Sequence, residues 1–134
     1  MKTAVIYWSG TGNTEAMANA VAEGAGADLF AVADFSGSVA DYDALAFGCP
    51  AMGAEVLEED EFEPFFTSIE SQLSGKRVLL FGSYGWGDGE WMRNWEDRTK
   101  AAGAALIAEG YTANEAPSDD DLAKLKALGA ELSA

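Results

Sequence analysis

The sequence has no histidine and a single cysteine, Cys49, among its 134 residues. These absences exclude an intrachain disulfide, zinc sites built on histidine or cysteine clusters, and Ser-His-Asp or Cys-His catalytic groups. Cys49 ends an apolar segment and has no basic neighbour in the sequence, so we interpret it as a packing residue rather than a reactive thiol. Any chemistry must therefore come from carboxylates, hydroxyls, aromatic rings or a bound cofactor.

Basic residues are also few, with 8 Lys and Arg against 23 Asp and Glu and a net charge of −15. Such a charge repels nucleic acid and anionic membranes and attracts basic protein surfaces, although simple solubility explains it equally well. No apolar run approaches the ~20 residues of a membrane span. The apolar segment at the start of the sequence is too short and too strand-like for a secretion signal. We therefore expect a cytoplasmic protein with no nucleic-acid or membrane partner.

Hydrophobic residues make up 49% of the chain, enough for a buried core, and the length suits one domain over residues 1–134. Strand-like and helix-like segments alternate, which predicts an α/β fold: a three-layer, doubly wound, five-stranded parallel sheet with helices on both faces. The expected strands cover residues 2–8, 28–33, 44–49, 77–82 and 105–111. The expected helices cover residues 14–25, 62–73 and 90–102. A capping box of Ser118 and Asp121 predicts the start of a last helix, which ends near Leu132.

Ligands of such sheets bind outside the carboxyl ends of the strands, where three loops are expected. The first loop follows a strand and precedes a helix. Its glycines and neutral side-chain donors, together with the N-terminus of that helix, are expected to bind one terminal phosphate. It lacks the lysine of a nucleoside-triphosphate loop, and Glu15 breaks the GxGxxG pattern. An ordinary strand-to-helix turn is the alternative. The residues of this loop are Ser9, Gly10, Thr11, Gly12, Asn13 and Thr14.

The second and third loops contain residues suited to a flat heterocycle. Met52 could lie against such a ring and Glu55 could accept a ring N–H, although the acidic run 55–63 is by itself more typical of a solvated surface loop. Trp86, between two glycines, is placed to stack on a planar ligand, with a role in capping the core as the alternative. Trp91 and Trp95 lie four residues apart on the next helix and are expected in the core.

Taken together and in this order, these segments resemble the flavodoxins, in particular the short-chain flavodoxins of anaerobic bacteria. The resemblance implies a flavodoxin-like sheet with strand order 2-1-3-4-5 and one non-covalently bound FMN. It also implies a monomeric, low-potential one-electron carrier, rather than an enzyme, that serves redox proteins with basic docking surfaces. The matching stretches are 5–15, 48–53, 55–66 and 80–89.

The resemblance also implies roles for individual residues. Residues 9–14 match the phosphate-binding stretch, Met52 the inner face of the flavin, and Trp86 its outer face. Gly53 matches the residue whose carbonyl turns toward flavin N5 on reduction, and Glu55 the acceptor for flavin N3–H. Ala54 replaces a polar residue of many relatives, and a positive φ there would cost roughly 1 kcal/mol. The other cofactor-binding residues expected are Pro50, Ala51, Ala54, Ser83, Tyr84, Gly85 and Gly87.

Two other functions fit parts of the pattern. An FMN-dependent NAD(P)H or quinone reductase on the same fold would need room over the ring that Trp86 is expected to fill, and turnover of NADPH and a quinone without a partner would identify it. A phosphate-binding or signalling domain would need clustered acids at the end of the first strand, where this chain has Trp8, Ser9 and Gly10. A colourless protein that ignores FMN would support that second alternative.

Overall fold

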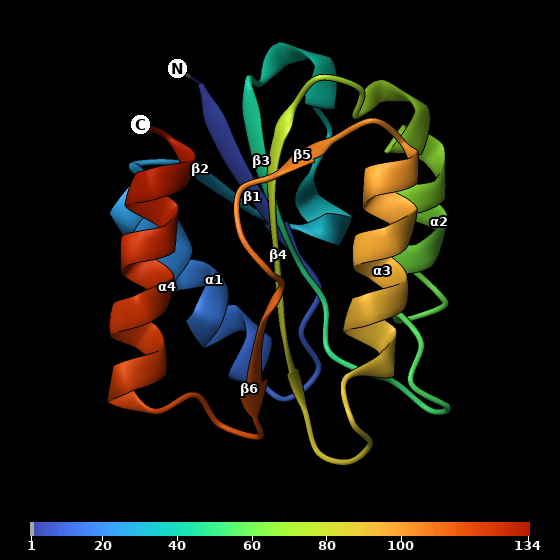
Figure 1. Cartoon of the computed structure of the whole chain (residues 1–134), viewed down its shortest axis with the longest axis vertical. Helices are drawn as coiled ribbons and strands as arrows, with labels where there is room; N and C mark the ends of the chain where they lie inside the picture. Colours follow the sequence, from blue (N-terminus) through green and yellow to red (C-terminus); the bar gives the residue numbers. More distant parts are fainter. Residues whose placement is uncertain (1) are drawn as a thin grey trace.

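The structure, a computed structural model, describes residues 2–134 and contains a parallel β-sheet (Figure 1). Its strand order is β2-β1-β3-β4-β5, as predicted, and β6 also pairs with β4. Every pairing of the strands is parallel, so their carboxyl ends lie at one edge of the sheet. The strands are β1 (Thr3–Tyr7), β2 (Asp28–Ala31), β3 (Ala44–Gly48), β4 (Arg77–Tyr84), β5 (Ala105–Leu106) and β6 (Tyr111–Asn114).

The last strand differs from the single strand predicted over residues 105–111. It is divided into β5 and β6, which pair with the beginning and the end of β4. Leu106 lies opposite Val78, and Tyr111 lies opposite Phe81. The chain therefore advances five residues between these pairs on the β5–β6 side but only three residues on β4. The extra residues bulge toward α3, where the Gly110 N–H donates to Glu96 Oε2 at 2.7 Å. The strand therefore ends three residues later than expected.

Helices cover both faces of the sheet (Figure 1). On one face lie α1 (Asn13–Ala25) and α4 (Asp119–Leu132); on the other lie α2 (Phe62–Ile69) and α3 (Glu90–Ala101). The predicted capping box of α4 is confirmed: Ser118 Oγ accepts from the Asp121 N–H at 3.1 Å, and Asp121 Oδ2 accepts from the Ser118 N–H at 2.9 Å. No helix within residues 2–134 is long and apolar enough to cross a membrane. The described residues also form short 3₁₀ helices, which are η1 (Val32–Asp34), η2 (Val39–Asp41) and η3 (Glu70–Gln72), and η3 continues α2.

The core on the α2–α3 face is aromatic. Trp95 meets Phe62 and Phe66 edge to face at centroid distances of 5.5 and 5.8 Å. Trp91 and Trp95 are each 2% exposed, which confirms them as core residues. Cys49 is fully buried as well, and burial raises the pKa of its thiol, so the prediction of an inert packing residue holds.

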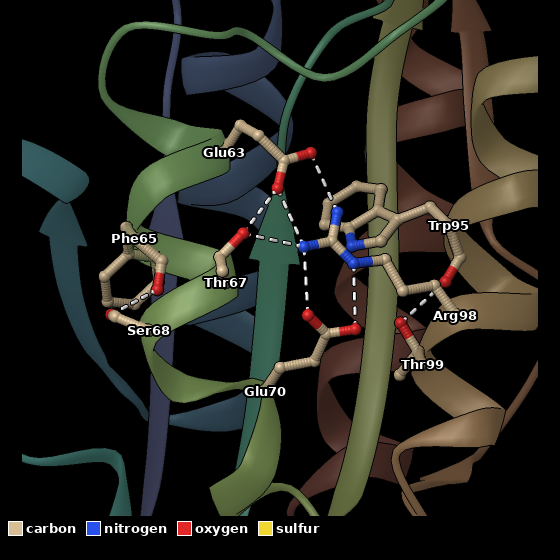
Figure 2. Close-up of polar contacts among 8 residues, drawn as sticks. All are labelled: Glu63, Phe65, Thr67, Ser68, Glu70, Trp95, Arg98 and Thr99. Carbon is tan, nitrogen blue, oxygen red and sulfur yellow. Dashed lines mark hydrogen bonds and ion pairs between the residues drawn. The ribbon is translucent and has the colours of Figure 1, made fainter.

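Arg98 of α3 binds two carboxylates of the α2 segment at once (Figure 2). Its guanidinium donates to both oxygens of Glu63 at 2.8 and 2.7 Å, to both oxygens of Glu70 at 2.9 and 3.0 Å, and to Thr67 Oγ1 at 3.0 Å. It also lies 4.9 Å from the centre of the Phe66 ring. This network joins the two helices whose N-termini follow the second and third loops.

Replacing Arg98 should therefore destabilise the fold. We expect Arg98→Met to lower the free energy of unfolding by about 2 kcal/mol, because several charge-assisted hydrogen bonds are lost from a partly buried site. Arg93→Met, which breaks an exposed ion pair with Asp88, is the matched control and should cost less than about 0.5 kcal/mol. Urea denaturation of both variants measures the difference, and equal losses would contradict a special role for Arg98.

The same network predicts a pH dependence. Hydrogen bonds from Arg98 hold the pKa of the Glu63 carboxyl below its ordinary value. A lowered folded pKa stabilises the protein above the unfolded value of ~4.3, and this contribution is lost as the pH falls through the folded value. The gap between wild type and Arg98→Met should therefore narrow as the pH falls from about 5 to about 3.

Candidate functional site

A cavity of about 570 Å³ lies where the carboxyl ends of the central strands meet. We call it the main cavity. Segments that follow β1, β3, β4 and β6 form its walls, so four separate parts of the chain contribute. Its lining residues are Trp8, Gly10, Thr11, Asn13, Pro50, Ala51, Met52, Ser83, Tyr84, Gly85, Trp86, Glu115 and Ala116.

The first loop is fixed by its own hydroxyl groups and by β4. Gly12, with φ of 94°, is the N-cap of α1, and its N–H donates to Ser9 Oγ at 3.1 Å. Thr14 is 1% exposed, and its hydroxyl lies 3.1 Å from Ser83 Oγ. Thr14 therefore anchors the loop to the sheet, while Thr11 and Asn13 line the main cavity at the N-terminus of α1. Ser9 and Gly12 line a neighbouring cavity instead.

The second loop is a tight turn closed by a two-way backbone bridge. The Met52 N–H donates to the Val56 carbonyl at 2.8 Å, and the Val56 N–H donates to the Met52 carbonyl at 3.0 Å. Left-handed backbone occurs at Gly53, with φ of 50°, and at Glu55, with φ of 57°. The positive φ considered for Ala54 therefore occurs at Glu55 instead. Met52 lines the main cavity, whereas Gly53 and Ala54 lie outside its walls.

Glu55 joins the second loop to the third. Its Oε1 accepts from the Asp88 N–H at 2.9 Å, and its Oε2 accepts from the Trp91 N–H at 3.2 Å. Gly87, with φ of 86°, lies so close to this carboxylate that a Cβ there would overlap it. A carboxylate offers about four acceptor positions, so Glu55 keeps the capacity for another N–H. Its role toward a ring N–H stays a prediction.

The third loop begins within β4 and carries an exposed indole. Ser83 and Tyr84 are the last residues of β4, and both line the main cavity with Gly85 and Trp86. Trp86 is 60% exposed, which rules out a core-capping role. An exposed tryptophan at the mouth of a cavity is typical of a surface that a planar ligand covers.

Sequence reasoning missed three residues of the main cavity: Trp8, Glu115 and Ala116. The Trp8 indole N–H donates to Glu61 Oε1 at 3.2 Å, and its ring leaves little room for a Cβ at Gly10. Glu115 follows β6, has left-handed backbone with φ of 56°, and donates its N–H to the Tyr84 carbonyl at 2.7 Å. A fourth strand-end loop could have been predicted if the last strand had been extended to Asn114.

The acidic run 55–63 is not a uniform solvated surface. Glu58 is 5% exposed, and its carboxylate accepts three backbone N–H groups at the start of α2, from Asp60 at 2.9 Å and from Glu61 and Phe62 at 2.8 Å each. Burial alone would raise the pKa of Glu58, but these donors hold it below its ordinary value. With Glu63 bound to Arg98, the exposed carboxylates of the run are Glu59, Asp60 and Glu61.

The chain is similar to proteins of known family over nearly its whole length. The sequence profile of the family described as Flavodoxin matches residues 5–129. The chain is 50% identical over 131 residues to the flavodoxin of Megasphaera elsdenii, covering 93% of each sequence. It is also 50% identical over 109 residues to the flavodoxin of Clostridium beijerinckii, covering 77% of this chain and 79% of that protein.

Solved structures agree with this likeness. The solution structure of two-electron reduced Megasphaera elsdenii flavodoxin matches with a TM-score of 0.80 at 46% identity, covering 96% of this chain and 98% of that one. A flavodoxin from the domain Archaea matches with a TM-score of 0.89 at 26% identity, covering 99% of this chain and 96% of that one. The likeness includes the sheet whose strand ends form the main cavity.

Proposed function

The chain belongs to the flavodoxin family, and on that premise we propose that it carries electrons one at a time, at low potential, between redox proteins with basic docking surfaces. Flavodoxins bind FMN and are electron-transfer proteins rather than enzymes with a substrate of their own. The reductase alternative is therefore set aside. A monomer in the cytoplasm is the form that we propose for this carrier.

The residues of the main cavity fit FMN. One end offers the hydroxyl of Thr11, the amide of Asn13 and the N-terminal N–H groups of α1, which suit a phosphate. The other end offers the thioether of Met52 and the exposed indole of Trp86, which suit a flat ring. When bound, FMN supplies redox chemistry in one-electron steps.

The chain's own residues then bind and orient the cofactor and limit the access of water to it. Thr14 and Ser83 hold the first loop against β4, and Glu55 holds the second loop against the third. These links connect the walls of the main cavity without occupying it. A carrier built in this way needs no general acid or base, which agrees with the absence of histidine.

The observation that carries the low-potential proposal is the charge around the main cavity. Within residues 2–134 no lysine or arginine lines it, whereas Glu115 does. Glu59 and Asp60 are exposed just beyond the second loop. Carboxylates repel the negative charge that arrives with the second electron, and so lower the potential at which it is accepted.

Neutralising three of these exposed groups tests the proposal. The variant Glu59→Gln/Asp60→Asn/Glu115→Gln should raise the potential of the second one-electron step by about 40–50 mV before salt screening, because each of the three charges at ~10–15 Å contributes roughly 0.3–0.4 kcal/mol. The potential of the first step should move less. If the flavin takes up a proton together with the first electron, its net charge would not change in that step, and nearby carboxylates would have little effect on it. Potentiometry at two salt concentrations measures both steps, and screening should reduce the shift at high salt.

A control with a similar change of charge is Asp97→Asn/Glu109→Gln, in which both carboxylates are exposed on the α3–β5 side of the molecule. It should leave both potentials within about 10 mV of wild type. Equal shifts of the two steps, or none, would show that these carboxylates do not set the low potential.

A further inference from the structure

A second cavity, of about 320 Å³, adjoins the main cavity. We call it the side cavity. It lies at the carboxyl ends of β1 and β2, between the first loop and the segment 31–33, and it shares Trp8 and Gly10 with the main cavity. Ser9 and Gly12 of the first loop also line it, whereas none of the roles derived above for cofactor binding uses its other polar residues, Tyr7, Glu15 and Glu61.

The polar groups of the side cavity are acceptors that chain residues fill only in part. Glu15 Oε2 accepts from the Tyr7 hydroxyl at 2.9 Å, and Glu61 Oε1 accepts from the Trp8 indole N–H at 3.2 Å. Each carboxylate therefore retains further acceptor positions. Both glutamates are exposed, and no lysine or arginine of residues 2–134 forms an ion pair with either one.

The negative charges at this cavity also act on the Tyr7 hydroxyl. Burial, the hydrogen bond to Glu15, and the charges of Glu15 and Asp34 together raise the pKa of the Tyr7 hydroxyl. The chain supplies no cation between Lys2 and Lys76, so nothing nearby in sequence neutralises these carboxylates. Within the described residues there is also no cluster of three or more carboxylate or thiol side chains that could hold a metal ion.

We propose that the side cavity receives one basic side chain, an arginine or a lysine, from the redox partner. A planar guanidinium can lie against the face of Trp8 and bind a carboxylate through paired N–H groups. An ammonium can satisfy the same carboxylates as a point charge. This inference rests on the proposed function, because it gives the basic partner a specific point of attachment.

The shared wall gives this contact a functional consequence. Trp8 lines both cavities, so a basic group bound in the side cavity lies next to the cofactor cavity. Charge pairs at an interface fix orientation and register as well as affinity. Docking at this point would therefore hold the partner beside the FMN site rather than anywhere on an acidic surface.

The variant Glu15→Gln/Glu61→Gln tests the inference with little change of shape. Each glutamine oxygen can still accept from Tyr7 or Trp8, while two charges are lost. The matched control Asp97→Asn/Glu109→Gln loses two charges on the α3–β5 side, away from β1 and β2. All proteins are loaded with FMN and kept oxidised, and the probe is cytochrome c, a basic haem protein.

Calorimetric titration at low salt measures the dissociation constant without electron flow. We expect Glu15→Gln/Glu61→Gln to weaken binding about three- to tenfold, the range for two charge pairs in partly solvated positions, and the control to weaken it less than about twofold. In wild type, the NMR signal of the Trp8 indole N–H should shift on addition of cytochrome c. In Glu15→Gln/Glu61→Gln that shift should shrink.

The outcomes separate the inference from the function beneath it. Equal weakening of both variants, or an unmoved Trp8 signal, would overturn the side cavity as the point of attachment and leave a general basic partner in place. Binding of cytochrome c that does not change with salt in wild type would overturn the basic docking surface as well. Selective weakening together with the Trp8 shift supports both.

Discussion

FMN should bind this protein about a thousandfold or more tightly than riboflavin, which lacks only the phosphate. The first loop offers the phosphate the hydroxyl of Thr11, the amide of Asn13 and the N–H groups at the start of α1. Hydrogen bonds to a charged group contribute ~1.5–3 kcal/mol each, so three of them suffice for this ratio. In the part of the chain that the structure describes, no lysine or arginine lines the main cavity, so the affinity depends on neutral donors.

Fluorescence titration of the apoprotein with both ligands measures the ratio, and a pair of matched variants locates its source. Thr11→Val removes one hydroxyl with little change of volume and should weaken FMN about tenfold while leaving riboflavin unchanged. Thr3→Val is the control, because Thr3 lies at the opposite end of β1 and its buried hydroxyl has no partner within the described residues. Equal affinities of the apoprotein for FMN and riboflavin would remove the first loop from phosphate binding.

The sheet and the first loop could be predicted from the sequence because local patterns encode them. Apolar strands alternating with amphipathic helices specify a parallel sheet, and its strand ends then locate the loops. The glycines and hydroxyls around Gly12 mark a strand-to-helix turn without any knowledge of distant contacts. Ser118 and Asp121 likewise form a capping box that lies within four residues.

The features that the sequence did not reveal depend on contacts between distant segments. The bulge that carries the last strand to Asn114 arises where Gly110 meets α3, and it brings Glu115 into the main cavity. Glu55 accepts from a backbone N–H group more than thirty residues away along the chain, and Arg98 of α3 binds Glu63 of α2. A run of acids looks the same in sequence whether its members are solvated or bound, so neither pairing could be read from composition.

Glu58 is the sharpest case of this difference, because the sequence placed it with the exposed acids and the structure buries it. We expect Glu58→Ala to lower the free energy of unfolding by about 3 kcal/mol or more, since three backbone N–H groups at the start of α2 lose their acceptor. Glu58→Gln should cost about 1–3 kcal/mol, because an amide keeps one acceptor oxygen but loses the charge. Neighbouring Glu59 is exposed, so Glu59→Gln should cost less than about 0.5 kcal/mol.

Urea denaturation at several pH values tests this assignment. The N–H donors hold the pKa of Glu58 below its ordinary value, so its contribution is complete above the unfolded value of ~4.3 and is lost as the pH falls through the folded one. The difference between wild type and Glu58→Gln should therefore be largest near neutral pH and shrink below about pH 4, while Glu59→Gln stays close to wild type throughout. A Glu58→Gln variant as stable as Glu59→Gln at pH 7 would mean that the α2 terminus does not need this carboxylate.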